Sequence, residues 1–323
     1  MLEDNASETL VLIVGSDEER TSWRYDPDCY FEDGNVVLLA GNILFRVHRG
    51  VLSLHSEVFN TLFALPQPQD AEVHDGCPLV RLQDEPMYLN WLLDTFYQGA
   101  TSAFMNPTAN LHIKDLEGML YLGDKYDVNH VRDEAIRRMK LILPADSLGH
   151  WASLDRCLQA ACVVHSGIEE CLVTLIGMAR RCGLEYLLPF AFYHCCRLKL
   201  SNFLTGEHQL SPDDMVLCMN ALPMLSWLEF QLVGAFSSPS VQANCKTLSQ
   251  CSPVLLELTH TYIKKAVSKD RPSPLVDIEF LYRNHRSSCK LCSSCSEAVA
   301  QLLEVRRQQV WNSLAGRKVA FKP

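Results

Sequence analysis

The sequence lacks the features that usually identify an enzyme or a membrane protein. It contains no Gly-x-Ser-x-Gly elbow for a nucleophilic serine and no glycine-rich phosphate loop. Its most apolar late run, Leu187 to Cys196, is about half of the roughly 20 residues that a spanning helix needs. The apolar stretch from Leu10 to Val14 follows an acidic start, which is not typical of a signal peptide. We therefore expect no membrane segment and no enzyme of these classes.

An excess of basic charge is also absent. The chain carries 38 acidic and 29 basic residues, a net charge of −9, which gives it no general attraction to nucleic acid. Arg137, Arg138 and Lys140 form one small basic group, and on a helix such a group is most often a solvated face. We expect no nucleic-acid partner.

Cysteine, by contrast, is plentiful, with 14 residues in a chain that is 48% hydrophobic and 21% charged. Without a secretory signal, these thiols are expected to be reduced, in the cytoplasm or the nucleus. His194, Cys195 and Cys196 are expected to be core residues of a helix. The length suits one large domain or two modest ones without covalent crosslinks.

The apolar pattern divides the chain into three parts. Residues 1–29 are polar and are expected to be a loosely ordered tail. The runs Val36–Leu39 and Ile43–Val47, joined by a Gly-Asn turn, predict a hairpin, and Leu79–Leu82 predicts a third strand. We therefore expect an α+β domain at residues 30–144, with a short three-stranded sheet and helices, followed by an all-α domain at residues 145–323 with a cysteine-rich end.

The helical pattern of the first domain begins at His48. Apolar residues then recur in steps of three and four, which predicts two short helices with Ser56 as a cap between them. Asp84 is expected to cap a helix that ends at Gly99. The apolar positions of the two short helices are Val51, Leu52, Val58, Phe59, Leu62 and Phe63.

The order and spacing of motifs in residues 31–143 resemble the BTB/POZ family, and some stretches resemble fungal, basidiomycete-like members. The carboxy-terminal half, with its late Cys-x-x-Cys and Val310-Trp311, resembles the tails of fungal BTB proteins more loosely. The matching elements are Asp33, Val36 to Leu39, Phe45-Arg46-Val47-His48-Arg49, Val51-Leu52, Ser56, Phe59, Leu62-Phe63, Gly76 to Asp84, Leu120, Gly123-Asp124-Lys125-Tyr126, Val131 and Ala135.

The resemblance implies an interaction domain without catalysis, in which many members form homodimers through their first helices. Two short helices cannot turn every apolar residue inward, and exposed apolar area marks a partner surface. We therefore expect Phe59 and Phe63 in the core and a two-fold contact on the other side. The expected contact residues are Val51, Leu52, Leu54, Val58 and Leu62. The expected structural residues of the family motif are Asp33, Phe45, His48, Ser56 and Phe59.

An alternative implied by the resemblance is a substrate-recruiting adaptor of a cullin ubiquitin ligase. The cullin-binding members often carry an apolar-x-Glu signature after the third strand, and residues 98–112 contain no glutamate. His48 also allows a catalytic reading, with Asp33 and a nearby serine as partners. The favoured interpretation is that His48 ends a strand and bonds to backbone at a helix start.

A cysteine cluster near the end is the remaining candidate site. Cys289, Cys292 and Cys295 form two overlapping Cys-x-x-Cys hooks, and His285 is a further candidate ligand. Either these cysteines hold one structural zinc ion or they are unpaired thiols. The preferred zinc ligands are Cys245, Cys251, Cys292 and Cys295.

Overall fold

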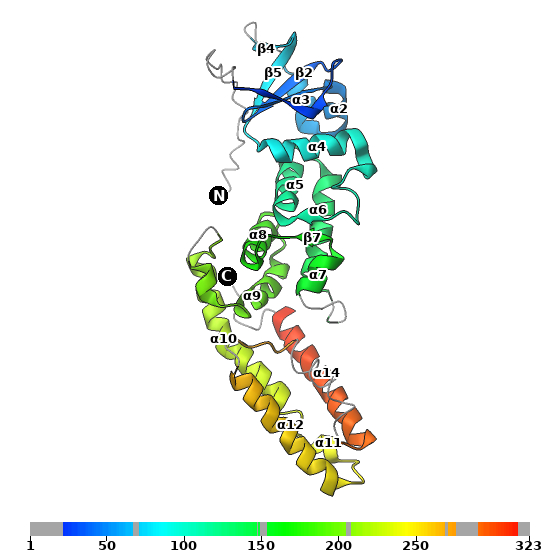
Figure 1. Cartoon of the computed structure of the whole chain (residues 1–323), viewed down its shortest axis with the longest axis vertical. Helices are drawn as coiled ribbons and strands as arrows, with labels where there is room; N and C mark the ends of the chain where they lie inside the picture. The colour runs from blue at the N-terminus through cyan, green and yellow to red at the C-terminus, as the bar shows by residue number, and fades with distance from the viewer. Residues whose placement is uncertain are drawn as a thin grey trace, which may run out of the picture. The chain divides into compact units, whose positions relative to one another are not determined.

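The computed structural model divides the chain into two compact units, residues 1–138 and 139–323 (Figure 1). This division lies six residues before the expected domain boundary, inside one helix. The residues that the structure describes are 22–66, 71–146, 148, 154–204, 208–268, 271–275 and 290–315.

The first unit is built on a five-stranded mixed sheet in the order β1-β3-β2-β5-β4. The predicted hairpin is confirmed, since β2 and β3 pair antiparallel through a turn in which Gly41 has a φ of +53°. β1 runs parallel to β3, and β5 parallel to β2, whose five residues are all buried. The strands are β1 Arg24–Tyr30, β2 Val36–Ala40, β3 Ile43–Val47, β4 Val73–His74 and β5 Cys77–Leu82.

The predictions of a three-stranded sheet and of a loose tail up to residue 29 were wrong. Arg24–Tyr30 is an edge strand, and most of its side chains are exposed, so its sequence lacks an apolar alternation. Pro27 lies within it, where an edge strand tolerates the missing backbone donor, and its pairing is irregular between Tyr25 and Tyr30. Residues 1–21 of the expected tail lie outside the described residues.

The helices of the first unit begin and end close to the predicted positions. Ser56 caps α3 as expected: its hydroxyl accepts a hydrogen bond from the backbone N–H of Phe59 at 3.2 Å. Asp84 is not a cap, because α4 begins after Glu85. The elements are α2 Arg49–His55, α3 Glu57–Ala64, α4 Pro86–Gln98, the 3-10 turn η1 Gly99–Thr101, the short strand β6 Leu111–His112, α5 Ile113–Lys125 and α6 Asn129–Ile142.

Asp84 instead lies buried and links the sheet region to the end of α5. It accepts a hydrogen bond from Lys125 Nζ at 2.7 Å and another from the hydroxyl of Tyr126. The Tyr126 ring stacks on Phe59, with 4.5 Å between ring centroids. Burial, followed by the charge of Asp84, raises the pKa of Tyr126. A buried charge is tolerated here because it is paired and hydrogen-bonded.

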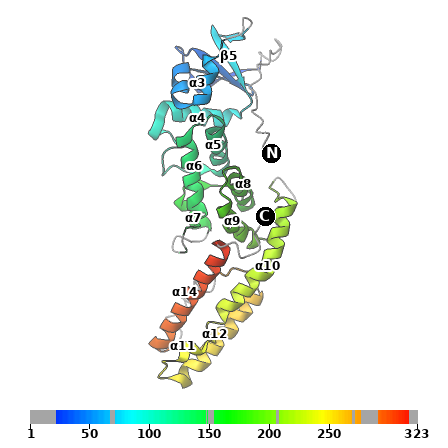
Figure 2. The ribbon, with the colours of Figure 1, turned by 180° about the vertical axis from the view of Figure 1, so that it is seen from behind.

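The second unit is mostly helical, as expected. Its longer helices α10, α12 and α14 run beside one another, as both views show (Figures 1 and 2). Its elements are α7 Leu154–Ala160, the short strand β7 Val163–Val164, α8 Ile168–Arg181, η3 Glu185–Leu187, α9 Leu188–Cys196, η4 Leu200–Phe203, α10 Pro212–Val233, α11 Pro239–Gln242, α12 Leu248–Ser268 and α14 Ser293–Ala315.

The apolar pattern around Pro223 predicts two helices, near residues 213–222 and 225–236, but α10 is a single helix. It continues through Pro223, whose ring lies on the exposed side. A proline removes one backbone hydrogen bond, and the packing of α10 against α9, α12 and α14 offsets that loss. The buried Asp214 of α10 pairs with Arg180 of α8, whose Nη1 donates at 2.8 Å.

No membrane segment was expected from the sequence, but α10 is long and apolar enough to cross a membrane by length and composition alone. In its most apolar 18-residue window, 39% of the residues are buried inside the protein. Together with the buried Asp214 and Glu229, this packing fits a core helix of the second unit.

Candidate functional site

An apolar surface on α2 and α3 is the first candidate site. Leu54 is 80% exposed, although it is a large aliphatic side chain. Three other residues that were predicted at the contact are half-buried: Val51 on α2, and Val58 and Leu62 on α3. Leu65, the C-cap residue that follows α3, is also exposed. We call the exposed side of these two helices the α2–α3 face.

One predicted contact residue needs correction. Leu52 is fully buried, so it belongs to the core of the unit and has no area left for a partner. Because a helix turns about 100° per residue, Leu54 projects about 200° away from Leu52 and is exposed. Phe59 lies in the core as predicted, whereas Phe63 is only half-buried, beneath the guanidinium of Arg49.

His48 lies at the junction between β3 and α2, where the sequence analysis considered a catalytic base. Its Nδ1 is 2.9 Å from the hydroxyl of Tyr97, which also accepts a hydrogen bond from the backbone N–H of His48 at 3.0 Å. Its Nε2 is 3.3 Å from Asp33, a side chain that is 86% exposed. His48 thus follows β3 and precedes the first turn of α2, and its ring bonds to side chains rather than to the backbone that the sequence suggested.

Ser56, a serine near His48 that could have been a catalytic nucleophile, has a structural role. It is buried, and its hydroxyl donates to the backbone carbonyl of Tyr126 at 2.6 Å while it caps α3. Phe45 is fully buried in β3, as expected of a structural residue. These contacts fit the structural roles that the sequence suggested for both residues.

Arg138 has a structural role that was not expected from the sequence. We expected a solvated face, but its side chain is 0% exposed. Its guanidinium donates to Glu134 at 2.9 Å and to the backbone carbonyls of Phe104, Asn106 and Ala109 at 3.2, 2.7 and 3.0 Å. It thus fixes the connection between α4 and α5. No local pattern distinguishes it from its exposed neighbour in sequence.

Burial alone would raise the pKa of Glu134, but hydrogen bonds from Arg137 and Arg138 outweigh it and lower that pKa. The carboxylate is therefore held charged between two guanidinium groups. Arg137 Nε donates to it at 2.7 Å from a largely solvated position. The two arginines share Glu134 as a partner, but Arg138 is buried and also bonds to the three backbone carbonyls.

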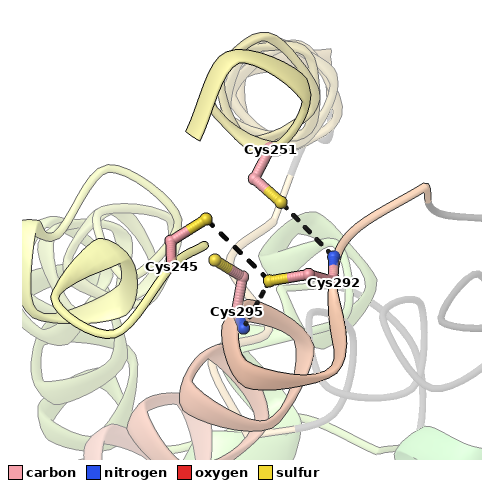
Figure 3. Close-up of side chains that lie close together, drawn as sticks. All are labelled: Cys245, Cys251, Cys292 and Cys295. Carbon is pink, nitrogen blue, oxygen red and sulfur yellow. Dashed lines mark hydrogen bonds between the residues drawn. The ribbon is translucent and has the colours of Figure 1, made fainter. Parts of the chain in front are cut away.

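The second candidate site is the set of four cysteines that the sequence analysis preferred, and the structure brings all four together (Figure 3). Their sulfur atoms all lie within 4.8 Å of one another. Cys251 and Cys295 are buried, whereas Cys245 and Cys292 are half-buried. Cys289 and His285, the other candidate ligands, lie outside the described residues.

Backbone N–H groups point at two of these sulfurs. The N–H of Cys295 donates to Cys292 Sγ at 3.5 Å, and the N–H of Cys292 donates to Cys251 Sγ at 3.3 Å. The bond from Cys295 is the principal reason why the pKa of Cys292 is lowered, while burial raises the pKa of Cys295. Such bonds favour a thiolate at Cys292.

The other buried cysteines are core residues. Cys195 and Cys196 are completely buried in α9 beside His194, as the sequence suggested. Burial raises the pKa of Cys195, which keeps this thiol protonated. These residues therefore pack as small apolar side chains.

Comparison with known proteins identifies the first unit. Residues 31–141, about a third of the chain, match the family model of the BTB/POZ domain. The matched range begins just after β1 and ends within α6, so it includes the α2–α3 face. No curated protein matches the chain. The match does not distinguish a fungal type, which stays a prediction. Residues 31–141 therefore form a BTB/POZ domain, a module for protein–protein interaction and not for catalysis.

Proposed function

We propose that the protein is a non-enzymatic scaffold that forms a homodimer through the α2–α3 face and presents its helical unit to another protein. The observation that carries this proposal is Leu54, 80% exposed among half-buried apolar neighbours within the BTB/POZ domain. An exposed apolar patch on an interaction domain marks a binding surface more often than a solvated one.

The charge of the α2–α3 face favours a second copy of the same chain as its partner. Among the Lys, Arg, Asp and Glu residues, the segment 49–64 contains one arginine, Arg49, and one glutamate, Glu57, so their charges balance. In a two-fold contact each patch meets itself, so a strongly one-signed surface would repel its copy. A nearly neutral apolar patch avoids that repulsion. A contact of standard size would bury about 800 Å² on each chain.

The helical unit carries a second exposed apolar surface, along α10. The exposed apolar residues of this surface are separated by about one or two helical turns, so they lie on one side of the helix. Trp227, which is 55% exposed, also borders a groove between α10 and α14 that Val305 and Val310 line. We propose this side of α10 as the surface that receives the other protein. Its exposed apolar residues are Val216, Met219, Trp227 and Phe230.

The dimer is tested by native mass spectrometry and by light scattering of the full chain. The wild type should appear at twice the chain mass of 36.5 kDa. Leu54→Asp places a charge at the centre of the proposed contact and should raise the dissociation constant roughly 30-fold, the effect of a loss of about 2 kcal/mol. Because Leu54 is exposed, this change leaves the fold of the monomer intact.

Met87→Asp is the matched control, since Met87 is a 53% exposed apolar residue of the same unit but lies on α4. It should leave the dimer unchanged. A wild type that stays monomeric at tens of micromolar, or an equal effect of both variants, would refute the α2–α3 contact.

A cullin ligase adaptor is the second candidate, and the two separate apolar surfaces favour it as much as a scaffold. In that case a cullin binds the BTB/POZ domain while the α10 surface holds a substrate. Capture of a cullin by the full-length wild type but not by Leu54→Asp would establish this role. Its absence from the captured proteins would leave the scaffold.

A further inference from the structure

We propose that the helical unit contains a structural zinc site in which the thiolates of Cys245, Cys251, Cys292 and Cys295 hold one Zn²⁺ ion. The ion joins two regions that are far apart in the sequence: the stretch from the α11–α12 connection into the first turn of α12, and the start of α14. Its role is structural and does not depend on the dimer proposed above.

The spacing of the sulfur atoms carries the assignment. Four thiolates arranged as a tetrahedron at about 2.3 Å from zinc lie about 3.8 Å from one another. Cys245 Sγ and Cys292 Sγ are 3.9 Å apart, and no pair within the set exceeds 4.8 Å. A disulfide would bring two sulfurs to about 2.05 Å. In Figure 3 the side chains of Cys245 and Cys251 point toward those of Cys292 and Cys295, which both come from the start of α14.

The backbone around the site supplies the hydrogen bonds that metal thiolates require. Cys251 lies in the first turn of α12. Cys295 lies in the first turn of α14, a helix that begins at the residue after Cys292. The partial positive charge of two helix N-termini therefore favours negatively charged sulfur. The hydroxyl of Thr247 lies 3.4 Å from Cys251 Sγ and provides a further polar contact at that ligand.

The chemistry of the ligand set favours zinc over harder ions. Four thiolates select a soft or borderline cation in tetrahedral geometry, whereas calcium and magnesium require oxygen. A cluster with sulfide bridging two irons would hold two thiolate pairs further apart than a single ion does. Four thiolates with Zn²⁺ carry a charge of −2. Lys246 and Lys290 lie one and two positions from ligands in the sequence and reduce the net charge of this region.

The metal would stabilise the short α11 and the connection that follows it. α11 has only four residues, and Cys245 follows it with a backbone bond to Gln242. α11 packs on α14, so a shared ion at their ends fixes the register between these segments. Zinc binding to a site that the unfolded chain lacks adds directly to the free energy of folding.

The test is metal analysis of the full-length protein, purified under reducing conditions with zinc present. Native mass spectrometry should show one zinc ion per chain. Cobalt replacing zinc should give the visible bands of a tetrahedral thiolate complex. Cys292→Ser should lose the ion to a chelator at a concentration that the wild type withstands. The control, Cys182→Ser, changes a half-buried cysteine at the end of α8 and should keep it.

A wild-type measurement covers the case in which Cys292→Ser fails to fold. Alkylation with and without zinc, mapped by mass spectrometry, should show zinc-dependent protection at the four proposed ligands only, because cysteines such as Cys195 and Cys196 are buried with or without the ion. Absence of bound zinc, retention of zinc by Cys292→Ser, protection of Cys289 in place of Cys245, or iron as the native metal would each overturn the assignment. So would a disulfide between any two of the four in protein purified under reducing conditions.

Discussion

The buried Arg138 allows a sharp test of how the BTB/POZ domain holds the connection between α4 and α5. Replacing it with methionine keeps most of the apolar length of the side chain and removes the guanidinium. That group donates to three backbone carbonyls and to Glu134 from a position with no solvent exposure.

The expected cost is large because the bonds are charge-assisted and buried. A hydrogen bond to a charged group contributes about 1.5–3 kcal/mol, but the exposed Asn106 can turn its carbonyl toward water once the donor is gone. Glu134 keeps Arg137 as a partner, so no carboxylate is left unpaired. We expect Arg138→Met to destabilise the first unit by about 3–5 kcal/mol, the range for breaking a buried charged pair.

Arg137→Met is the matched control. It removes a partner of the same carboxylate from the next position in the chain, but this side chain is 45% exposed. Surface ion pairs contribute about 0–1 kcal/mol, so this variant should be nearly neutral. The difference between the two effects therefore measures the burial of Arg138 together with its bonds to the three carbonyls, because both variants remove one positive charge.

The assay is hydrogen exchange of the full chain in increasing urea, followed by peptide. Peptides of the first unit should lose protection at lower urea in Arg138→Met, and those covering residues 99–111 should exchange faster even without urea. Peptides of α8 and α10 should be unchanged. Equal effects of the two substitutions, or unchanged exchange at residues 99–111, would refute the proposed role of the guanidinium.

Two further predictions concern single buried groups. Burial, followed by the charge of Arg197, lowers the pKa of His194 to about 3, so the unfolded chain takes up the proton first. This contribution to stability is present above about pH 6.5 and is lost as the pH falls toward 3. The loss between pH 7 and pH 5 should be about 2 kcal/mol, measured as a decrease in the urea midpoint of the helical unit. A folded His194→Gln variant should not show this decrease. Ser56→Ala removes a helix cap and a buried donor and should destabilise the first unit by about 1–3 kcal/mol in urea titration. Ser53→Ala, at a half-buried position on α2, should have a small effect, and equal midpoints for the two serine variants would contradict the capping role.

The sequence predicted the parts of the fold in which local pattern and tertiary environment agree. The hairpin of β2 and β3 is an apolar run on each side of a turn, and both strands are mainly buried. The cysteine set was found for a similar reason, because a Cys-x-x-Cys hook directs two sulfurs to one point whatever lies around it. The grouping of Cys245 and Cys251 with that hook is confirmed as geometry, while the bound ion stays a proposal.

The failures come from positions where distant contacts decide. β1 was missed because an exposed edge strand needs no apolar alternation, and its pairing with β3 depends on residues about 20 positions away. α10 continues through Pro223 because neighbouring helices support it. Asp84 has the residue type of a cap, but the chain brings Lys125 and Tyr126 to it from 41 and 42 positions further on. None of these contacts has a local signal.

Pairs of near neighbours with opposite environments show why the proposed surface has to be tested with variants chosen from the structure. Leu52 and Leu54 have the same side chain, yet one is completely buried and the other 80% exposed. An aspartate at Leu52 would unfold the domain and abolish any dimer for a trivial reason, whereas at Leu54 it meets only solvent or a partner. A lost dimer is therefore informative at Leu54 alone. It follows that the dimer and the zinc site can fail separately, because Leu54 lies in the BTB/POZ domain and all four cysteines lie in the helical unit.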